Sequence, residues 1–311
     1  TSGIYAYSRT LNQLAEEALD LIQAVGDGET LGGDAIDRVR PALNGLLKEA
    51  QTQGLHLWTQ TEGTLFLEVG QASYDLSTVK AANTYYETTT TAATAAAASS
   101  IPATSATNIQ ADDVIGIIQN DNNLFWTTVR SVSTLTINLD DNITLATLSG
   151  AVVYNYRPTP TLIPISRITD VRRKEGTDYE IPILNQSRAD YFNLPNKAQT
   201  GTPIQSYYSR GDVAGEVAGT MYLWNAPDSS VPVINFTYER KLEIMVNATD
   251  TLDFPDYAHE YIVYNLAKRL IPKFGASQGV TALIMAQAEE TKRDMLAYGN
   301  SMYPIQIGIA R

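Results

Sequence analysis

Helical periodicity is confined to the two ends of this chain, and this separation constrains the fold more than any other feature of the sequence. Near the N-terminus, apolar residues recur at spacings of three and four in two stripes, 11–25 and 36–50. Near the C-terminus, a second pair is expected to begin after Pro255 and at about Gln278. In the last of these four helices we expect five residues to face inward: Val280, Leu283, Ile284, Ala288 and Met295.

The middle of the chain has the pattern of strands. Short runs of β-branched and aromatic residues alternate with Gly, Asn, Asp and Pro, which is typical of strands and turns. We expect strands at 64–66, 71–76, 179–184, 189–194, 204–208, 220–224 and 231–240. The predicted fold class is therefore α+β, with a helical bundle body from the N- and C-terminal helices, a β-rich middle and an inserted small all-β domain.

Residues 78–158 have a composition of their own. The segment contains the low-complexity run TTTTAATAAAASS at 88–100, followed by strand candidates at 114–119, 124–132, 134–139 and 151–156. We predict an inserted all-β domain at 78–158 within a body formed by 1–77 and 159–311. Residues 299–311 would then be a C-terminal extension.

Composition narrows the possible chemistry. The chain has no cysteine, two histidines, and a net charge of −12. Metal centres built on cysteine or paired histidines are therefore not expected, and neither is a cysteine nucleophile. The sequence also lacks a GxSxG elbow and a phosphate-binding GxxxxGK[ST] loop. We predict no enzyme activity, no cofactor and no metal site, and the lack of a long apolar run predicts no membrane span.

Basic residues gather at two places in this acidic chain. Arg172, Arg173 and Lys174 lie on a probable strand, and Lys268 and Arg269 lie late in a helix, where cations suit the helix dipole. The bulk negative charge and the absence of interleaved aromatic residues argue against a nucleic-acid site. We therefore assign these five residues to an interface with an acidic neighbouring subunit.

The order of several segments resembles a known family. These segments are RTLNQLAEEALDLIQAVG (9–26), RPALNGLLKEAQTQGLHLWTQTEGTLFLEVGQASYDLS (40–77), ITDVRRKEGTDYEIPILNQSRADYFNLPNKAQTGTPIQSYYSRG (168–211), MYLWNAPDSSVPVINFTYERKLE (221–243) and FPDYAHEYIVYNLAKRLIPKFG (254–275). Together they cover roughly two-thirds of the chain and are similar to head-to-tail adaptor proteins, also called connector or head-completion proteins, of podovirus-like tailed bacteriophages. The insertion at 78–158 is a departure from the compact members of that family.

The resemblance implies a structural virion protein at the head–tail junction, made in the host cytoplasm. Such adaptors form a ring, commonly of twelve copies, which joins the portal protein to tail or nozzle proteins and continues the DNA channel. Genomic DNA would pass through without sequence-specific binding, and an acidic lumen would repel its phosphates. The C-terminal extension commonly reaches the portal, and the positions that would dock there are Ile305, Ile307, Ile309 and Arg311.

Two other functions compete with this interpretation. The inserted β domain could bind a receptor or carbohydrate in a tail-associated protein, with Trp126 and tyrosines stacking on sugars. Alternatively, a pair of carboxylates such as Asp112-Asp113 or Asp140-Asp141 could act as acid and base in a glycosidase. Folding of the isolated 78–158 segment with retention of glycan would favour the first, and loss of turnover on changing one acidic pair would favour the second.

Overall fold

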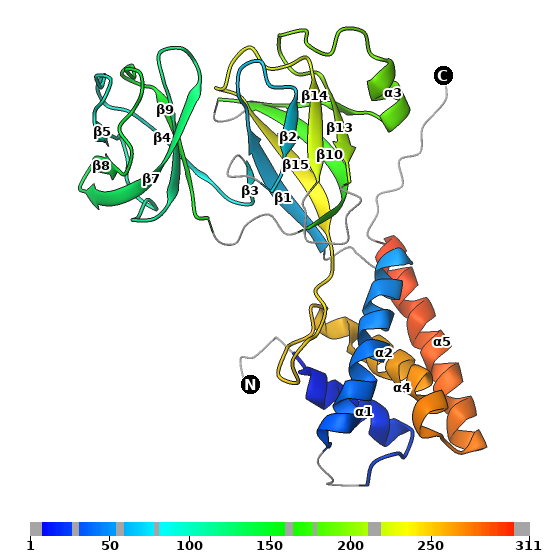
Figure 1. Ribbon diagram of the computed structural model, residues 1–311. Coiled ribbons are helices and arrows are strands. Elements are labelled where there is room, and N and C mark those ends of the chain that lie inside the picture. The colour runs from blue at the N-terminus through cyan, green and yellow to red at the C-terminus, as the bar shows by residue number, and fades with distance from the viewer. Residues whose placement is uncertain are drawn as a thin grey trace. The chain divides into compact units, whose positions relative to one another are not determined.

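The chain divides into two compact units. The computed structural model describes residues 8–26, 31–53, 59–77, 81–158, 164–176, 179–210 and 219–301. One unit, here called the helical unit, comprises Thr1–Thr59 with Leu242–Arg311. The other, the β unit, comprises Gln60–Lys241 and is the larger. Figure 1 labels their elements.

The predicted fold class is wrong, because β-sheet and not a helical bundle makes up most of the fold. The described residues form sheets of five, four and six strands. The terminal helices are confined to the smaller unit: α1 (Leu11–Leu21), α2 (Gly33–Thr52), α4 (His259–Phe274) and α5 (Gln278–Ser301). The physical reason for the error is that helices leave a strong local periodicity, whereas short strands whose partners are distant in sequence do not.

The helical unit is held by one apolar core. Thr10 begins α1 with a capping box, in which its hydroxyl accepts from the Gln13 amide and the Gln13 side chain accepts from the Thr10 amide. Pro41 lies inside α2 and does not mark its start, and α4 ends at Gly275, where φ is +81°. Leucines and other apolar residues of α1, α2 and α4 are fully buried together, and α5 adds Ile284 and Met295. Packing of amphipathic faces therefore stabilises these helices.

The β unit contains three sheets. The five-stranded sheet has the order β11-β10-β15-β1-β3, the four-stranded sheet β12-β13-β14-β2, and the six-stranded sheet β4-β9-β6-β7-β8-β5. The bounds are β1 (Gln60–Phe66), β2 (Ser73–Asp75), β3 (Ala81–Ala82), β4 (Tyr86–Thr89), β5 (Ser100–Pro102), β6 (Val114–Ile118), β7 (Leu124–Ser133), β8 (Thr136–Leu139), β9 (Val152–Tyr156), β10 (Ile165–Glu175), β11 (Tyr179–Pro182), β12 (Leu184–Asn185), β13 (Gln205–Ser209), β14 (Thr220–Trp224) and β15 (Val233–Arg240).

The first two sheets share a core, and their pairing joins distant parts of the chain. Strand β1 pairs antiparallel with β15, so that Gly63 lies opposite Phe236. The inward side chains of both sheets form one buried cluster, which includes Leu65 of β1 and Leu223 of β14. A short helix, α3 (Arg188–Asn193), belongs to this part of the unit. The sequence pattern predicts a strand at 189–194, and this prediction is wrong.

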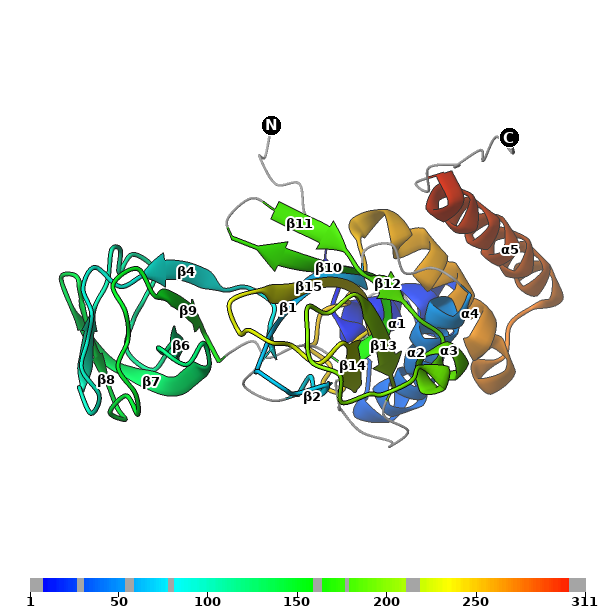
Figure 2. The same cartoon turned by 90° about the horizontal axis from the view of Figure 1, so that it is seen from above.

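The six-stranded sheet is anchored to the five-stranded sheet by an aromatic cluster. Phe66, at the end of β1, is fully buried and contacts the rings of Trp126, Tyr154 and Tyr156 from the six-stranded sheet. Figure 2 shows this sheet as a separate layer beside the other strands. The division into 1–77 plus 159–311 and an inserted domain at 78–158 stays a prediction.

Candidate functional site

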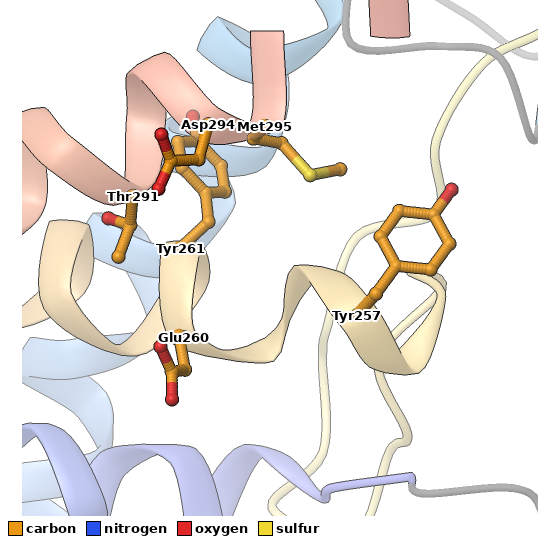
Figure 3. Close-up of a pocket in the computed structure, with 6 residues that line it drawn as sticks. All are labelled: Tyr257, Glu260, Tyr261, Thr291, Asp294 and Met295. Carbon is orange, nitrogen blue, oxygen red and sulfur yellow. The ribbon is translucent and has the colours of Figure 1, made fainter. Parts of the chain in front are cut away.

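A pocket opens between α4 and α5 of the helical unit. Its volume is about 210 Å³, and it is lined by Tyr257, Glu260, Tyr261, Thr291, Asp294 and Met295. The first three come from the turn Asp256–Ala258 and the start of α4, and the last three come from successive turns of α5. Figure 3 shows Glu260 on one side of the α4 ribbon and Thr291 and Asp294 on the other.

The polar groups of this pocket do not form an acid–base pair. Glu260 projects from α4 on the side away from α5, where Asp294 lies, whereas general acid–base chemistry needs groups that share a reacting atom. The Thr291 hydroxyl donates to the carbonyl of Gln287 at 2.9 Å, which ties it to its own helix. Burial raises the pKa of Tyr261 to about 12, so its phenol is protonated at neutral pH.

Alkaline pH is expected to destabilise the helical unit through Tyr261. The pKa of this phenol is about 12 in the folded chain, against an ordinary value of 10.0. A pKa that is raised on folding contributes stability that is fully present below the unfolded-state pKa and is lost as pH rises toward the folded-state pKa. The contribution of Tyr261 is therefore present below about pH 10 and lost between about pH 10 and 12.

Urea unfolding at pH 9, 10 and 11, followed by circular dichroism, measures this loss. Tyr261→Phe keeps the ring and removes the titrating hydroxyl, so its stability should fall less over this range than that of the wild type. Tyr257→Phe is the matched control, because Tyr257 is about half exposed and should behave as the wild type does. An identical pH dependence in Tyr261→Phe and the wild type would contradict the assignment.

Arg172 of β10, predicted at a subunit interface, is surrounded by carboxylates of its own chain. Its guanidinium lies 3.0 Å from Glu62, 3.0 Å from Asp170 and 3.4 Å from Glu180. Other strands of the five-stranded sheet supply two of these partners: Glu180 comes from the adjacent strand β11, and Glu62 comes from β1, which lies beyond β15. The residue is thus part of an ion-pair network on the sheet.

The next two basic residues of β10 are also bound within the chain. Arg173 is buried and donates to the carbonyl of Pro203 at 2.7 Å. Lys174 donates to the hydroxyl of Tyr85 at 2.9 Å and to the carboxylate of Glu87 at 3.4 Å. Both side chains therefore tie β10 to other segments of the β unit.

The two basic residues of α4 have partners on neighbouring helices. Lys268 pairs with Glu289 of α5 at 2.6 Å, and Arg269 pairs with Glu49 of α2. All five basic residues thus have intrachain partners, and their assignment to a subunit interface stays a prediction. The predicted portal-docking residues lie outside the described part of the chain: Ile305, Ile307, Ile309 and Arg311.

Large apolar side chains are exposed on the helical unit, and the sequence pattern missed them. Leu283 of α5, expected to face inward, is 63% exposed, and Met285 is about half exposed. Ile244 and Val246, in the segment before α4, are more than half exposed. The inward stripe of α5 uses Ile284, which leaves Leu283 one position away on the outer side of the helix.

A second surface is an aromatic group on the β unit. Phe192 of α3 is 51% exposed, and the cations of Arg188 and Lys197 lie 5.8 Å and 5.6 Å from its ring centroid. Tyr207 of β13 and Tyr222 of β14 stack beside it with ring centroids 5.8 Å apart. No local sequence motif joins these residues, because the contact between α3 and two strands is tertiary.

Trp126 and one residue of each acidic pair, Asp113 and Asp140, make contacts within the fold of the β unit. Trp126, considered as a sugar-stacking residue, packs its ring on Phe66 inside the aromatic cluster. Asp113 is buried and accepts from the side-chain amide of Asn155 at 3.1 Å. Asp140 accepts from the hydroxyl of Thr128, a bond that lowers the pKa of this carboxyl. These contacts hold strands of the six-stranded sheet together.

None of the described helices combines the length and apolarity needed to cross a membrane. In the described residues, no three side chains of His, Cys, Asp or Glu lie close enough together to hold a metal ion.

Comparisons with known proteins leave the family open. No protein-family model matches the chain, and no curated protein matches it. Among the solved structures that match is the Gp54 tailspike of Acinetobacter baumannii bacteriophage AP22 in complex with A. baumannii capsular saccharide, at 18% identity and a TM-score of 0.21. The match covers 24% of this chain, and the chain spans 15% of the tailspike. A likeness this limited carries no inference about fold or function.

Proposed function

We propose that the chain is a structural subunit of a tailed-phage virion and assembles into an adaptor ring between portal and tail. The observation that carries the proposal is the exposure of large apolar side chains at two separate places on the helical unit, Ile244 with Val246 before α4 and Leu283 on α5. A subunit of a ring needs two different contact surfaces, one for each neighbour. The ordered series of segments that resembles head-to-tail adaptors supports the same function.

The net negative charge of the chain is compatible with a further role of the proposed ring, the passage of DNA through it. Each chain has a net charge of −12, so a ring of twelve copies would be strongly acidic. Such a ring would weaken electrostatic adhesion of the phosphate backbone, and DNA could slide through it.

Native mass spectrometry of the chain, alone and mixed with the portal protein of the same phage, tests this function. We expect a closed oligomer with a mass near twelve copies, either alone or bound to the portal. A chain that stays monomeric under both conditions would overturn the proposal. Truncation before Met302 separately tests the predicted docking of the C-terminal extension, since it should abolish portal attachment and leave the fold intact.

A second candidate function is saccharide binding by a tail-associated protein. The observation that favours it is the half-exposed ring of Phe192 with the cations of Arg188 and Lys197 within 6 Å of its centroid, because an exposed aromatic ring beside cations can bind an acidic sugar. On a glycan array, Phe192→Ala should lose any signal that the wild type gives. Tyr179→Ala, which removes an exposed aromatic ring elsewhere in the β unit, should keep it. Absence of wild-type signal on acidic glycans would exclude this candidate.

A further inference from the structure

The short helix α3 is fixed on the four-stranded sheet by aromatic packing. Tyr207 of β13 lies opposite Tyr222 of β14, and their rings stack with centroids 5.8 Å apart. The buried ring of Tyr191 packs against both of these rings, and its hydroxyl donates to the carbonyl of Leu223 at 3.4 Å. Figures 1 and 2 both show α3 beside β13. The other side chains of α3 are therefore held on a rigid support.

Arg188 presents an unused guanidinium beside the Phe192 ring. The two residues are four positions apart on α3 and share one face of this helix, with the guanidinium carbon 5.8 Å from the ring centroid. This cation–π contact uses none of the five N–H donors of arginine. Within the described part of the chain, Arg188 makes no ion pair and donates no hydrogen bond. The acidic residue nearest in sequence, Asp190, accepts instead from the Ser187 hydroxyl at 2.6 Å.

Lys197 adds a second positive charge at the same place. Its Nζ lies 5.6 Å from the ring centroids of both Tyr191 and Phe192. Two of its three N–H donors are used within the chain, on the carbonyls of Phe192 at 3.0 Å and Leu194 at 3.1 Å. Lys197, like Arg188, has no carboxylate partner among the described residues, whereas all three basic residues of β10 have one. Two uncompensated cations therefore meet at one half-exposed aromatic ring.

We propose that Arg188, Phe192 and Lys197, here called the α3 site, bind a sugar that carries a carboxylate, and this inference rests on the saccharide-binding candidate above. Arg188 binds the carboxylate through two parallel N–H donors, whose spacing matches the two carboxylate oxygens. The exposed part of the Phe192 ring packs on the C–H face of the sugar ring. Lys197 contributes its charge, while two of its donors stay on the α3 backbone.

The charge of the whole chain makes the two cations decisive. With a net charge of −12 the chain repels anions at long range, so an acidic ligand is attracted only where cations lie close to it. At physiological salt, charges more than about 8 Å away are largely screened. Arg188 and Lys197 therefore set the potential at the α3 site. A neutral sugar of the same shape would gain neither this attraction nor the charge-assisted hydrogen bonds to Arg188.

A glycan array that prints each carboxylated sugar beside its methyl ester tests the α3 site with the full chain. The ester keeps the sugar and removes its charge, so the wild type should bind the acid about tenfold more tightly or better. Arg188→Gln should bring binding of the acid down close to that of the ester, whereas Phe192→Ala should weaken both forms. Arg38→Gln is the charge-matched control, because it removes an exposed arginine of α2 and should bind as the wild type does. Circular dichroism verifies that each variant is folded.

The outcomes separate this inference from the saccharide-binding function itself. A folded Arg188→Gln variant that keeps the wild-type preference for acid over ester would overturn the α3 site and leave saccharide binding standing. Wild-type binding of sulfated glycans but of no carboxylated ones would have the same meaning, because it would exclude the carboxylate as the recognised group. A wild type that binds no acidic glycan would overturn both the function and the inference.

Discussion

Replacing Phe66 with alanine should lower the free energy of unfolding of the β unit by about 3–5 kcal/mol. The side chain is fully buried at the end of β1, and four aromatic rings, those of Tyr85, Trp126, Tyr154 and Tyr156, lie with centroids 5.2–5.7 Å from its own. Its removal forfeits apolar burial and leaves a cavity that rigid rings cannot fill. Because those rings belong to the six-stranded sheet and its approach, the loss should also weaken the hold of that sheet on β1.

Urea denaturation followed by circular dichroism and tryptophan fluorescence measures this effect, since Trp126 lies in the cluster. Tyr179→Ala is the matched control: it also deletes an aromatic ring, but Tyr179 is 65% exposed, and its loss should cost less than about 1 kcal/mol. A Phe66→Ala variant within 1 kcal/mol of the wild type would show that this cluster does not couple the sheets.

The sequence predicts the helices well where periodicity is local. The stripe that begins at Leu11 and the one expected from about Gln278 correspond to α1 and α5, and Gly275 ends α4 as its position suggests. Periodicity reports where an apolar face exists, but it does not report how much of that face a partner covers. Leu283 was therefore assigned to the core although it lies outside it.

The predicted fold class was wrong for a related reason. Whether helices or sheets dominate depends on pairings such as β1 with β15, which join residues more than 160 positions apart. The low-complexity run at 88–100 also conceals order, because Thr90, Thr94 and Ala97 make backbone hydrogen bonds to residues 143–151. The aromatic group around Phe192 could not be predicted either, since α3, β13 and β14 meet only in the folded chain.

Gly219→Ala should destabilise the β unit by about 2 kcal/mol more than the same change at Gly70. Both glycines have positive φ, +88° at Gly219 and +77° at Gly70, so alanine pays a similar backbone cost at each, about 1–2 kcal/mol. A Cβ at Gly70 meets open space, whereas one at Gly219 would lie 2.5 Å from the Tyr208 hydroxyl and 2.8 Å from the Ser209 carbonyl. Backbone at Ser209 cannot move aside without disturbing β13.

The same denaturation measurement separates the backbone cost from the cost of the steric clash, because Gly70→Ala pays only the backbone cost. The Gly219 carbonyl also accepts from the Leu76 amide at 2.9 Å, so a displaced backbone there would strain the link between β2 and β14. Equal destabilisation by the two substitutions would mean that β13 shifts to accommodate the new Cβ without any loss of stability. The close packing of β13 against the entry to β14 would then not contribute to the stability of the four-stranded sheet.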